Sequence, residues 1–250
     1  GRNGESPMPV LAATSPTDCF DAAYEASKMA LEHMTPVVLL TDAFVANGSA
    51  AWKLPKLADY PAIQPPFVPA ELKGTWTPYQ RNEEGVRYWA IPGTEGFTHI
   101  LGGLEKDNAT GAISTNPENH HLMTQLRQQK IDNIKVPDVV VEGDKDDAEL
   151  LIVGFGGTYG HLHAAMDDMR AAGKKVALAH FKYINPLPKN TEEVLKKYPK
   201  VVVAEQNMGQ FAGYLRMKID GFVPNQYNEV KGQPFVVNEL VAAFTEIYNK

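Results

Sequence analysis

The sequence has a single cysteine, no long hydrophobic run and no excess of positive charge. Cys19 alone can form neither an internal disulfide nor an iron–sulfur centre, which ordinarily takes four cysteines. The longest apolar runs, Thr35–Thr41 and Leu150–Val153, are far shorter than the roughly 18 residues that cross a bilayer. The 24 Lys and Arg are scattered among 30 Asp and Glu, giving a net charge of −6. We therefore expect a cytoplasmic protein that binds neither membrane nor nucleic acid.

The first 60 residues predict a helix followed by a strand. Ser15 and Pro16 form a helix start, and small or apolar residues then recur at helical spacing to about His33. Thr35–Asp42 is an apolar run bounded by turn formers, which predicts a strand buried on both faces. The next residues, to about Ala112, are rich in proline and aromatics, and predict an ordered arm packed on a surface, which another subunit could supply.

Two features lie between this arm and a more regular region. Asn116 and Pro117 predict the start of an exposed helix whose apolar face holds Leu122, Leu126, and Ile131 or Ile134. The acidic segment 137–147 indicates a domain boundary.

Strands and helices alternate in the last hundred residues, which predicts an α/β domain with a parallel sheet covered on both faces. The expected strands are 150–153, 175–180 and 200–205, and the expected helices are 161–172, 191–197, 210–219 and 237–248. The division we expect is therefore 1–60, 61–146 and 147–250.

The glycine-rich turn after the strand at 150–153 does not fit a dinucleotide fingerprint. Gly154 and Gly156 match its first two glycines, but Tyr159 stands where the third belongs, and no ribose-binding acid ends the next strand. Gly156 and Gly157 could hold another anion or could only let the helix approach the sheet, and the structural interpretation is favoured.

Polar loops follow two of the expected parallel strands, where ligands gather in open α/β sheets. They supply the candidate residues Asn47, Ser49, Asn207, Gly209 and Gln210, although a simple turn explains each loop equally well. No histidine, cysteine or carboxylate spacing indicates a metal site, and no nucleophile carries a catalytic signature, so no catalytic residue is assigned. Cys19 lies on the small-residue face of the first helix, where burial would raise its pKa.

Several loop segments together resemble the α subunit of 2-oxoglutarate:ferredoxin oxidoreductases, in the wider family of 2-oxoacid:acceptor oxidoreductases. They run in order along the whole chain: Gly1–Pro7, Ser15–Phe20, Thr35–Asp42, Ala46–Ser49, Pro92–Gly96, Gly102–Lys106, Tyr183–Pro186 and Asn207–Gln210. The family's Tyr-Pro-Ile-Thr-Pro motif is absent, and the chain begins on Gly1 rather than Met, so we expect the C-terminal part of a longer subunit.

The resemblance implies a thiamine-diphosphate enzyme that decarboxylates a 2-oxoacid, forms an acyl-coenzyme A and passes electrons to ferredoxin. Residues 1–60 would then be the tail of the pyrimidine-binding domain, and residues 147–250 a domain like the C-terminal domain of transketolase. A β subunit would carry the diphosphate-binding domain, Mg²⁺ and the iron–sulfur cluster. Arg2, with Asn3 and Glu5 beside it, is the candidate for binding a dicarboxylate substrate. The alternative is a non-catalytic module of the same fold that only docks partners or binds a small ligand.

Overall fold

The computed structural model describes residues 4–100 and 102–250, which form two compact units. The first unit contains residues 4–10, 23–38 and 53–135, and the second contains 11–22, 39–52 and 136–250. The α/β class expected from the sequence is confirmed, because helices and strands alternate through the second unit. The expected division at residues 60 and 146 stays a prediction.

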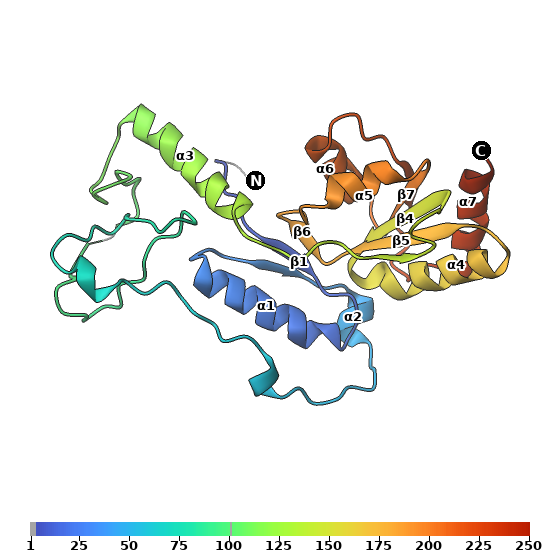
Figure 1. Ribbon diagram of the computed structural model, residues 1–250, viewed down its shortest axis with the longest axis horizontal. Coiled ribbons are helices and arrows are strands. Elements are labelled where there is room, and N and C mark those ends of the chain that lie inside the picture. Colours follow the sequence, from blue (N-terminus) through green and yellow to red (C-terminus); the bar gives the residue numbers. More distant parts are fainter. Residues whose placement is uncertain (1–3, 101) are drawn as a thin grey trace. The chain divides into compact units, whose positions relative to one another are not determined.

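The larger sheet of the second unit has five strands in the order β3-β5-β4-β7-β8. Figure 1 labels its central strands β5, β4 and β7. Neighbouring strands are parallel except β3, which is antiparallel to β5 at one edge. The strands are β3 (Val141–Gly143), β4 (Leu150–Phe155), β5 (Val176–Phe181), β7 (Val201–Glu205) and β8 (Asn225–Asn228).

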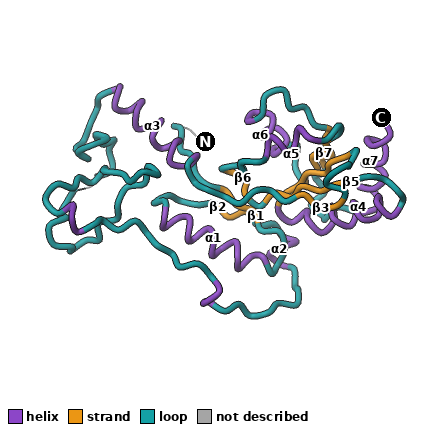
Figure 2. Tube along the Cα trace, in the orientation of Figure 1, coloured by secondary structure: helices purple, strands orange, loops and turns teal. Residues whose placement is uncertain are grey.

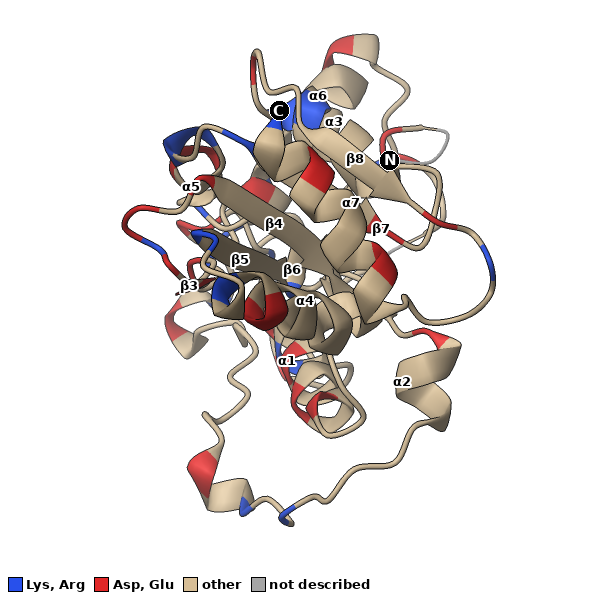
Figure 3. Cartoon of the chain, turned by 90° about the vertical axis from the view of Figure 1, so that its right-hand side faces the viewer, with Lys and Arg blue, Asp and Glu red and all other residues tan. Residues whose placement is uncertain are grey.

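Alternate residues of these strands face two separate cores. Leu151 and Val153 of β4 pack in the core closed by α5 (Thr191–Lys197) and α6 (Gln210–Lys218). Leu150 and Ile152 pack in the other, closed by α4 (Tyr159–Ala171) and α7 (Val237–Asn249). Strands β4 and β5 carry no Lys, Arg, Asp or Glu, as Figure 3 shows. A strand buried on both faces has to be apolar throughout, which is why these runs are recognisable in the sequence.

Every helix and strand expected after residue 147 is present, with ends within two residues of the prediction. In this part of the chain, from residue 140 on, the sequence prediction missed three short strands: β3, β6 (Tyr183–Asn185) and β8. Each has three or four residues, too few to show a periodic pattern.

A smaller sheet has the order β2-β1-β6, with β1 at Val10–Ala12 and β2 at Val38–Leu40. The Ala12 amide donates to the Lys182 carbonyl at 2.8 Å, and the Ala13 amide donates to the Leu40 carbonyl at 3.0 Å. Helix α1 (Asp18–Glu32) connects β1 to β2 and begins as expected, since Ser15 Oγ accepts from the Asp18 amide at 3.1 Å.

The expectation that the Thr35–Asp42 strand is buried on both faces is wrong. Val38 and Leu40 are each 37% exposed, and β2 has only three residues. The reason is its place at the edge of the small sheet, where β1 is its only neighbouring strand.

The first unit contains the proline-rich arm, which Figure 2 shows as loop with few helical turns. The arm is held to α1 by specific bonds: Tyr24 OH donates to the Pro61 carbonyl at 2.7 Å, and Trp89 Nε1 donates to the Leu31 carbonyl at 2.9 Å. Its helices are η1 (Leu57–Asp59) and η2 (Ala70–Leu72), both 3-10, and it leads into α3 (Pro117–Asp132).

Helix α3 starts at the expected cap, because Asn116 Oδ1 accepts from the amides of Glu118 and Asn119 at 2.8 and 3.1 Å. Its expected apolar face was partly wrong. Ile131 and Ile134 are buried as expected, but Leu122 is 38% exposed and the neighbouring Met123 is buried in its place. Near the start of α3 the buried position is therefore one residue later than the leucine spacing indicates.

Candidate functional site

The carboxyl ends of four strands border a pocket of about 270 Å³ in the second unit. Strands β1 and β2 contribute from the small sheet, and β4 and β7 from the large one. The lining residues are Ala12, Ala13, Leu40, Thr41, Asp42, Phe155, Gly156, Gly157, Thr158, Gln206, Asn207 and Gln210. Strand ends are where open α/β sheets usually bind ligands, so this pocket is the candidate site.

The structure brings four of the residues expected from the sequence into this pocket: Gly156, Gly157, Asn207 and Gln210. Asn47 does not line it, and its side-chain amide donates back to the Ala43 carbonyl at 3.0 Å within α2 (Ala43–Asn47). Ser49 and Gly209 do not line it either. Glu5 belongs to the first unit, and Arg2 and Asn3 lie outside the described residues. The proposed binding roles of all these residues stay predictions.

The glycine turn owes its composition to close packing. A Cβ on Gly157 would stand 2.1 Å from Oδ2 of Asp42, and a Cβ on Gly154 would stand 2.2 Å from Cδ1 of Leu162. Gly156 has φ +63°, a conformation that glycine adopts without strain. Asp42 is itself fixed, because its Oδ1 caps α2 by accepting from the Val45 amide at 2.9 Å. The turn therefore lets β4, α4 and the Asp42 loop meet at one point.

The loop after β7 caps its own helix. Buried Glu205 accepts from the amides of Phe211 and Ala212 at 2.7 and 2.9 Å. Asn207 Oδ1 accepts from the amides of Gly209 and Gln210 at 2.9 and 2.8 Å. These two side chains satisfy the amides that a helix N-terminus would otherwise offer to an anion. The loop thus positions α6, and Asn207 contributes to the pocket wall at the same time.

The groups that face the pocket suit binding better than catalysis. They include one carboxylate, Asp42, the Thr158 hydroxyl and the side-chain amides of Gln206, Asn207 and Gln210. His161 is near Asp42; burial lowers the pKa of His161, and the Asp42 carboxylate opposes that shift. No set of three or more His, Cys, Asp or Glu that could hold a metal occurs among residues 4–100 and 102–250. The pocket can donate and accept hydrogen bonds with a polar ligand, and the Thr158 hydroxyl already donates to the Phe155 carbonyl at 2.7 Å.

Sequence reasoning missed the residues that β1 contributes, Ala12 and Ala13. Their signal is present as the short apolar stretch from Val10 to Ala13, which lies between Pro9 and Thr14. A strand that short is recognised only when its pairing partners are known.

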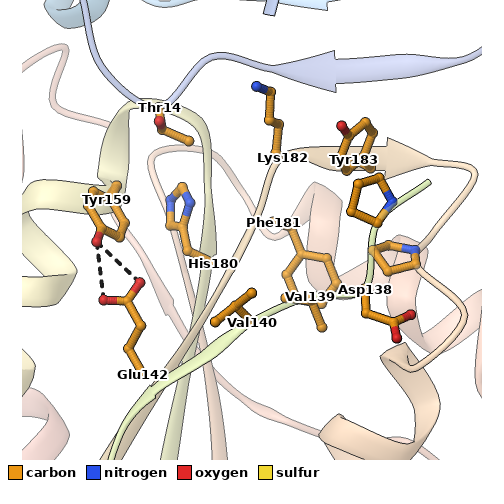
Figure 4. Close-up of a pocket in the computed structure, with 12 residues that line it drawn as sticks. Thr14, Asp138, Val139, Val140, Glu142, Tyr159, His180, Phe181, Lys182 and Tyr183 are labelled. Atoms are coloured by element: carbon orange, nitrogen blue, oxygen red, sulfur yellow. Dashed lines mark hydrogen bonds between the residues drawn. The ribbon is translucent and has the colours of Figure 1, made fainter. Parts of the chain in front are cut away.

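A second hollow of about 240 Å³ lies beside β3, β5 and α4 (Figure 4). Tyr159 OH donates to both carboxylate oxygens of Glu142 at 3.1 Å, and the Tyr159 ring meets the His180 ring edge-on with centroids 5.1 Å apart. His180 Nε2 lies 3.3 Å from Thr158 Oγ1. Burial lowers the pKa of His180 to about 3, so the imidazole is neutral in the folded protein at neutral pH.

Acidification should therefore destabilise the protein through His180. In the unfolded chain its pKa is near 6.5, so below that pH unfolding takes up a proton that the folded imidazole does not bind until about pH 3. The free energy of unfolding therefore decreases as pH falls, and His180 accounts for a decrease of about 2 kcal/mol between pH 7 and pH 5. Denaturant unfolding at both pH values should show this loss in the parent protein and a much smaller one in His180→Gln. The exposed His121→Gln should keep the parent slope, and an unchanged slope in His180→Gln would contradict the assignment.

Cys19 behaves as expected. It packs with Ala13, Ala22 and Val45 in a small core, and burial raises the pKa of its thiol, with the carboxylates of Asp18 and Asp42 adding to the effect. It is a free cysteine with the properties of a small hydrophobic residue.

Comparison with protein families matches most of the chain to two models. Residues 2–115 match "Pyruvate flavodoxin/ferredoxin oxidoreductase, thiamine diP-bdg", and residues 148–239 match "Pyruvate:ferredoxin oxidoreductase core domain II". The chain is 48% identical over 242 residues to the 2-oxoglutarate oxidoreductase subunit KorA of Mycobacterium tuberculosis, covering 96% of this chain and 36% of the relative. The chain belongs to the 2-oxoacid:ferredoxin oxidoreductase family.

Other members of this family are more distant. The α subunit of 2-oxoacid:ferredoxin oxidoreductase 1 of Aeropyrum pernix is 28% identical over 257 residues, covering 98% of this chain and 39% of the relative. A solved structure of 2-oxoglutarate:ferredoxin oxidoreductase from Magnetococcus marinus, with 2-oxoglutarate, coenzyme A and succinyl-CoA bound, matches with a TM-score of 0.88 at 28% identity. That match covers 98% of this chain and 43% of the other. The chain thus spans well under half the length of these family members.

No helix in the described part of this family member is long and apolar enough to cross a membrane. The family resemblance inferred from the loop segments is confirmed.

Proposed function

We propose that this chain is the C-terminal part of the α subunit of a thiamine-diphosphate-dependent 2-oxoglutarate:ferredoxin oxidoreductase. The whole enzyme would decarboxylate 2-oxoglutarate, transfer the succinyl group to coenzyme A and pass electrons to ferredoxin. The observation that carries the proposal is the 48% identity, along 96% of this chain, to a subunit named for 2-oxoglutarate. Relatives named only for 2-oxoacids are 24–28% identical, and other relatives named for 2-oxoglutarate are 25–30% identical.

The residues of this chain do not fit the metal-containing groups of such an enzyme. One cysteine cannot ligate an iron–sulfur cluster. The described residues offer no acidic cluster for the Mg²⁺ that accompanies a diphosphate. As the family resemblance implies, we propose that a β subunit carries the cluster, Mg²⁺ and the diphosphate-binding half.

The role of this chain is to build one side of an assembled site. Its second unit holds a pocket with an acceptor carboxylate and amide groups. The same unit exposes large apolar side chains, including Phe44 and Trp52, each 46% exposed. Such exposure is typical of surfaces that another chain covers. Coenzyme A would enter as co-substrate in the assembled enzyme.

Separate and combined subunits test this proposal. The complete α subunit and its β partner are purified apart, and each is assayed with 2-oxoglutarate, coenzyme A and ferredoxin or a viologen dye. We expect the visible absorbance of the iron–sulfur cluster in the purified β subunit and not in the α subunit. We expect the acceptor to be reduced only when both subunits are mixed. A mixture that fails to reduce either acceptor would contradict the proposed function.

The second candidate is a non-catalytic docking module. The lining of the strand-end pocket, mainly apolar groups, glycines and side-chain amides, suits ligand binding or docking and favours it. Calorimetric titration of the complete α subunit with thiamine diphosphate and with coenzyme A separates the two, because measurable affinity for either ligand contradicts a role limited to docking.

A further inference from the structure

Five cationic side chains of the first unit surround a pocket of about 220 Å³. Arg81 and Arg87 come from the proline-rich arm, Lys106 follows the glycines at 102–103, and Arg127 and Lys130 lie on α3. Nothing in the proposed function assigns a ligand to this pocket, and its Gly102–Lys106 segment has no other role so far.

The positive charges of this pocket are poorly balanced. Glu105 is its only lining carboxylate; it lies 3.4 Å from Nη1 of Arg127 and 2.5 Å from Nδ1 of His120. Within the described residues, no carboxylate lies at ion-pair distance from the other four cations. The polar partners of these four cations are backbone carbonyls and methionine sulfurs.

Lys106 is buried, and Arg81, Arg87 and Lys130 are partly buried; buried charge normally requires a counter-charge. Lys106 is 2% exposed, and its Nζ donates to the Leu104 carbonyl at 2.6 Å. Lys130 Nζ donates to the Met34 carbonyl at 2.9 Å. Burial, together with the neighbouring arginines, lowers the pKa of Lys130 to about 8. Burial likewise lowers the pKa of Arg81, with Arg87 adding to the effect.

The guanidinium groups are held in place before any ligand arrives. The Arg87 guanidinium carbon lies 4.5 Å from the centroid of the Tyr79 ring, and that of Arg81 lies 5.8 Å from it. Arg81 also donates to the carbonyls of Tyr79 and Asn108 at 3.1 and 3.0 Å. Side chains fixed in this way lose little conformational entropy on binding.

We propose that this pocket binds a multiply charged phosphate group, either as inorganic pyrophosphate or as the phosphate end of an organic molecule. Four unbalanced cations exceed what one carboxylate would neutralise, whereas a phosphate carries close to two charges and several acceptor oxygens. The pocket is smaller than the roughly 300 Å³ at which drug-sized sites begin, so it takes the phosphate rather than a whole large ligand.

Acylation footprinting of the complete α subunit tests this site directly. The protein is treated with acetic anhydride at pH 8, and modification of Lys130 is read by peptide mass spectrometry. Parallel samples contain pyrophosphate, coenzyme A, 2-oxoglutarate or sodium chloride at the same ionic strength. We expect pyrophosphate to slow modification of Lys130 several-fold and to leave the exposed Lys53 and Lys56 unchanged.

A substitution ties the protection to the pocket. In Arg87→Met the concentration of pyrophosphate that half-protects Lys130 should rise by about tenfold, since one charge-assisted contact is lost. Lys53→Met makes a matched charge change outside the pocket and should leave protection unaltered. Arg87→Met removes repulsion between cations together with the Arg87 contacts to the Tyr79 ring and the Pro78 carbonyl, so its melting temperature is measured beside that of the parent. Should that variant unfold, Lys106→Met takes its place.

The arms also separate the possible outcomes. Protection by coenzyme A alone would identify an organic phosphate as the ligand and supports the proposal. Protection by sodium chloride equal to that by pyrophosphate, protection by 2-oxoglutarate alone, no protection at all, or full protection retained in the pocket variant would each overturn it.

Discussion

Replacing Glu205 with leucine should lower the free energy of unfolding by about 3–5 kcal/mol. The carboxylate is fully buried and accepts two helix amides, at 2.7 Å from Phe211 and 2.9 Å from Ala212. Leucine fills a similar volume and accepts neither, so both buried amides lose their partner. Urea unfolding followed by circular dichroism gives the difference directly.

Two variants calibrate the Glu205 result. Glu205→Gln keeps one acceptor oxygen and should cost less than the leucine change. Glu192→Leu makes the same chemical change on exposed helix surface and should alter stability by no more than about 0.5 kcal/mol. If Glu205→Leu were as mild as Glu192→Leu, the carboxylate would not be holding α6 to the end of β7.

Substitutions at Gly157 and Asp42 should have strongly coupled effects on the free energy of unfolding, because the two residues are in contact. A methyl group at position 157 would meet the Asp42 carboxylate at 2.1 Å and force it off the cap of α2, so Gly157→Ala should cost about 1–3 kcal/mol. Asp42→Ala alone should cost about 1 kcal/mol as a lost cap. In the double variant the collision is gone, so the combined cost should fall below the sum by about 1 kcal/mol or more.

Gly160→Ala is the matched control for this cycle. Gly160 lies in α4, a few residues further along, and a Cβ there meets nothing within 4 Å. Alanine is the better helix former, so this change should stabilise the protein by up to about 1 kcal/mol. Additive costs for Gly157→Ala and Asp42→Ala would show that the turn and the Asp42 loop do not meet as the structure has them.

The sequence predicts the elements that carry local signals. Helix α5 matches residue for residue because Thr191 and Lys197 delimit a short polar helix between prolines, and α3 begins at the expected Asn116 cap. Strands β4, β5 and β7 are apolar runs because both of their faces are buried, which leaves a strong composition signal.

Non-local features could not be predicted in the same way. Strand β8 has the polar sequence Asn-Gln-Tyr-Asn, and it is a strand because it pairs with β7. The prediction that β2 is buried on both faces was wrong, because composition does not reveal that a strand lies at the edge of a sheet.

The sequence predicted where the candidate pocket lies, at the carboxyl ends of strands, but only some of the residues that line it. Strand-end reasoning found Asn207 and Gln210, and the glycine pattern found Gly156 and Gly157. The pocket at Arg81, Lys106 and Lys130 was not foreseen, because its cations are scattered along fifty residues and only the folded arm gathers them.

The central claim is that this chain belongs to an enzyme acting on 2-oxoglutarate, and initial rates with competing substrates test it most directly. The complete α and β subunits, supplied with thiamine diphosphate, Mg²⁺ and coenzyme A, are assayed for ferredoxin reduction with 2-oxoglutarate, pyruvate and a branched-chain 2-oxoacid. We predict that kcat/KM for 2-oxoglutarate exceeds that for either other substrate by about tenfold or more. A site that binds the second carboxylate of 2-oxoglutarate loses that contact with pyruvate and with a branched-chain 2-oxoacid, which lack this group. Equal or faster reduction with pyruvate would contradict the claim.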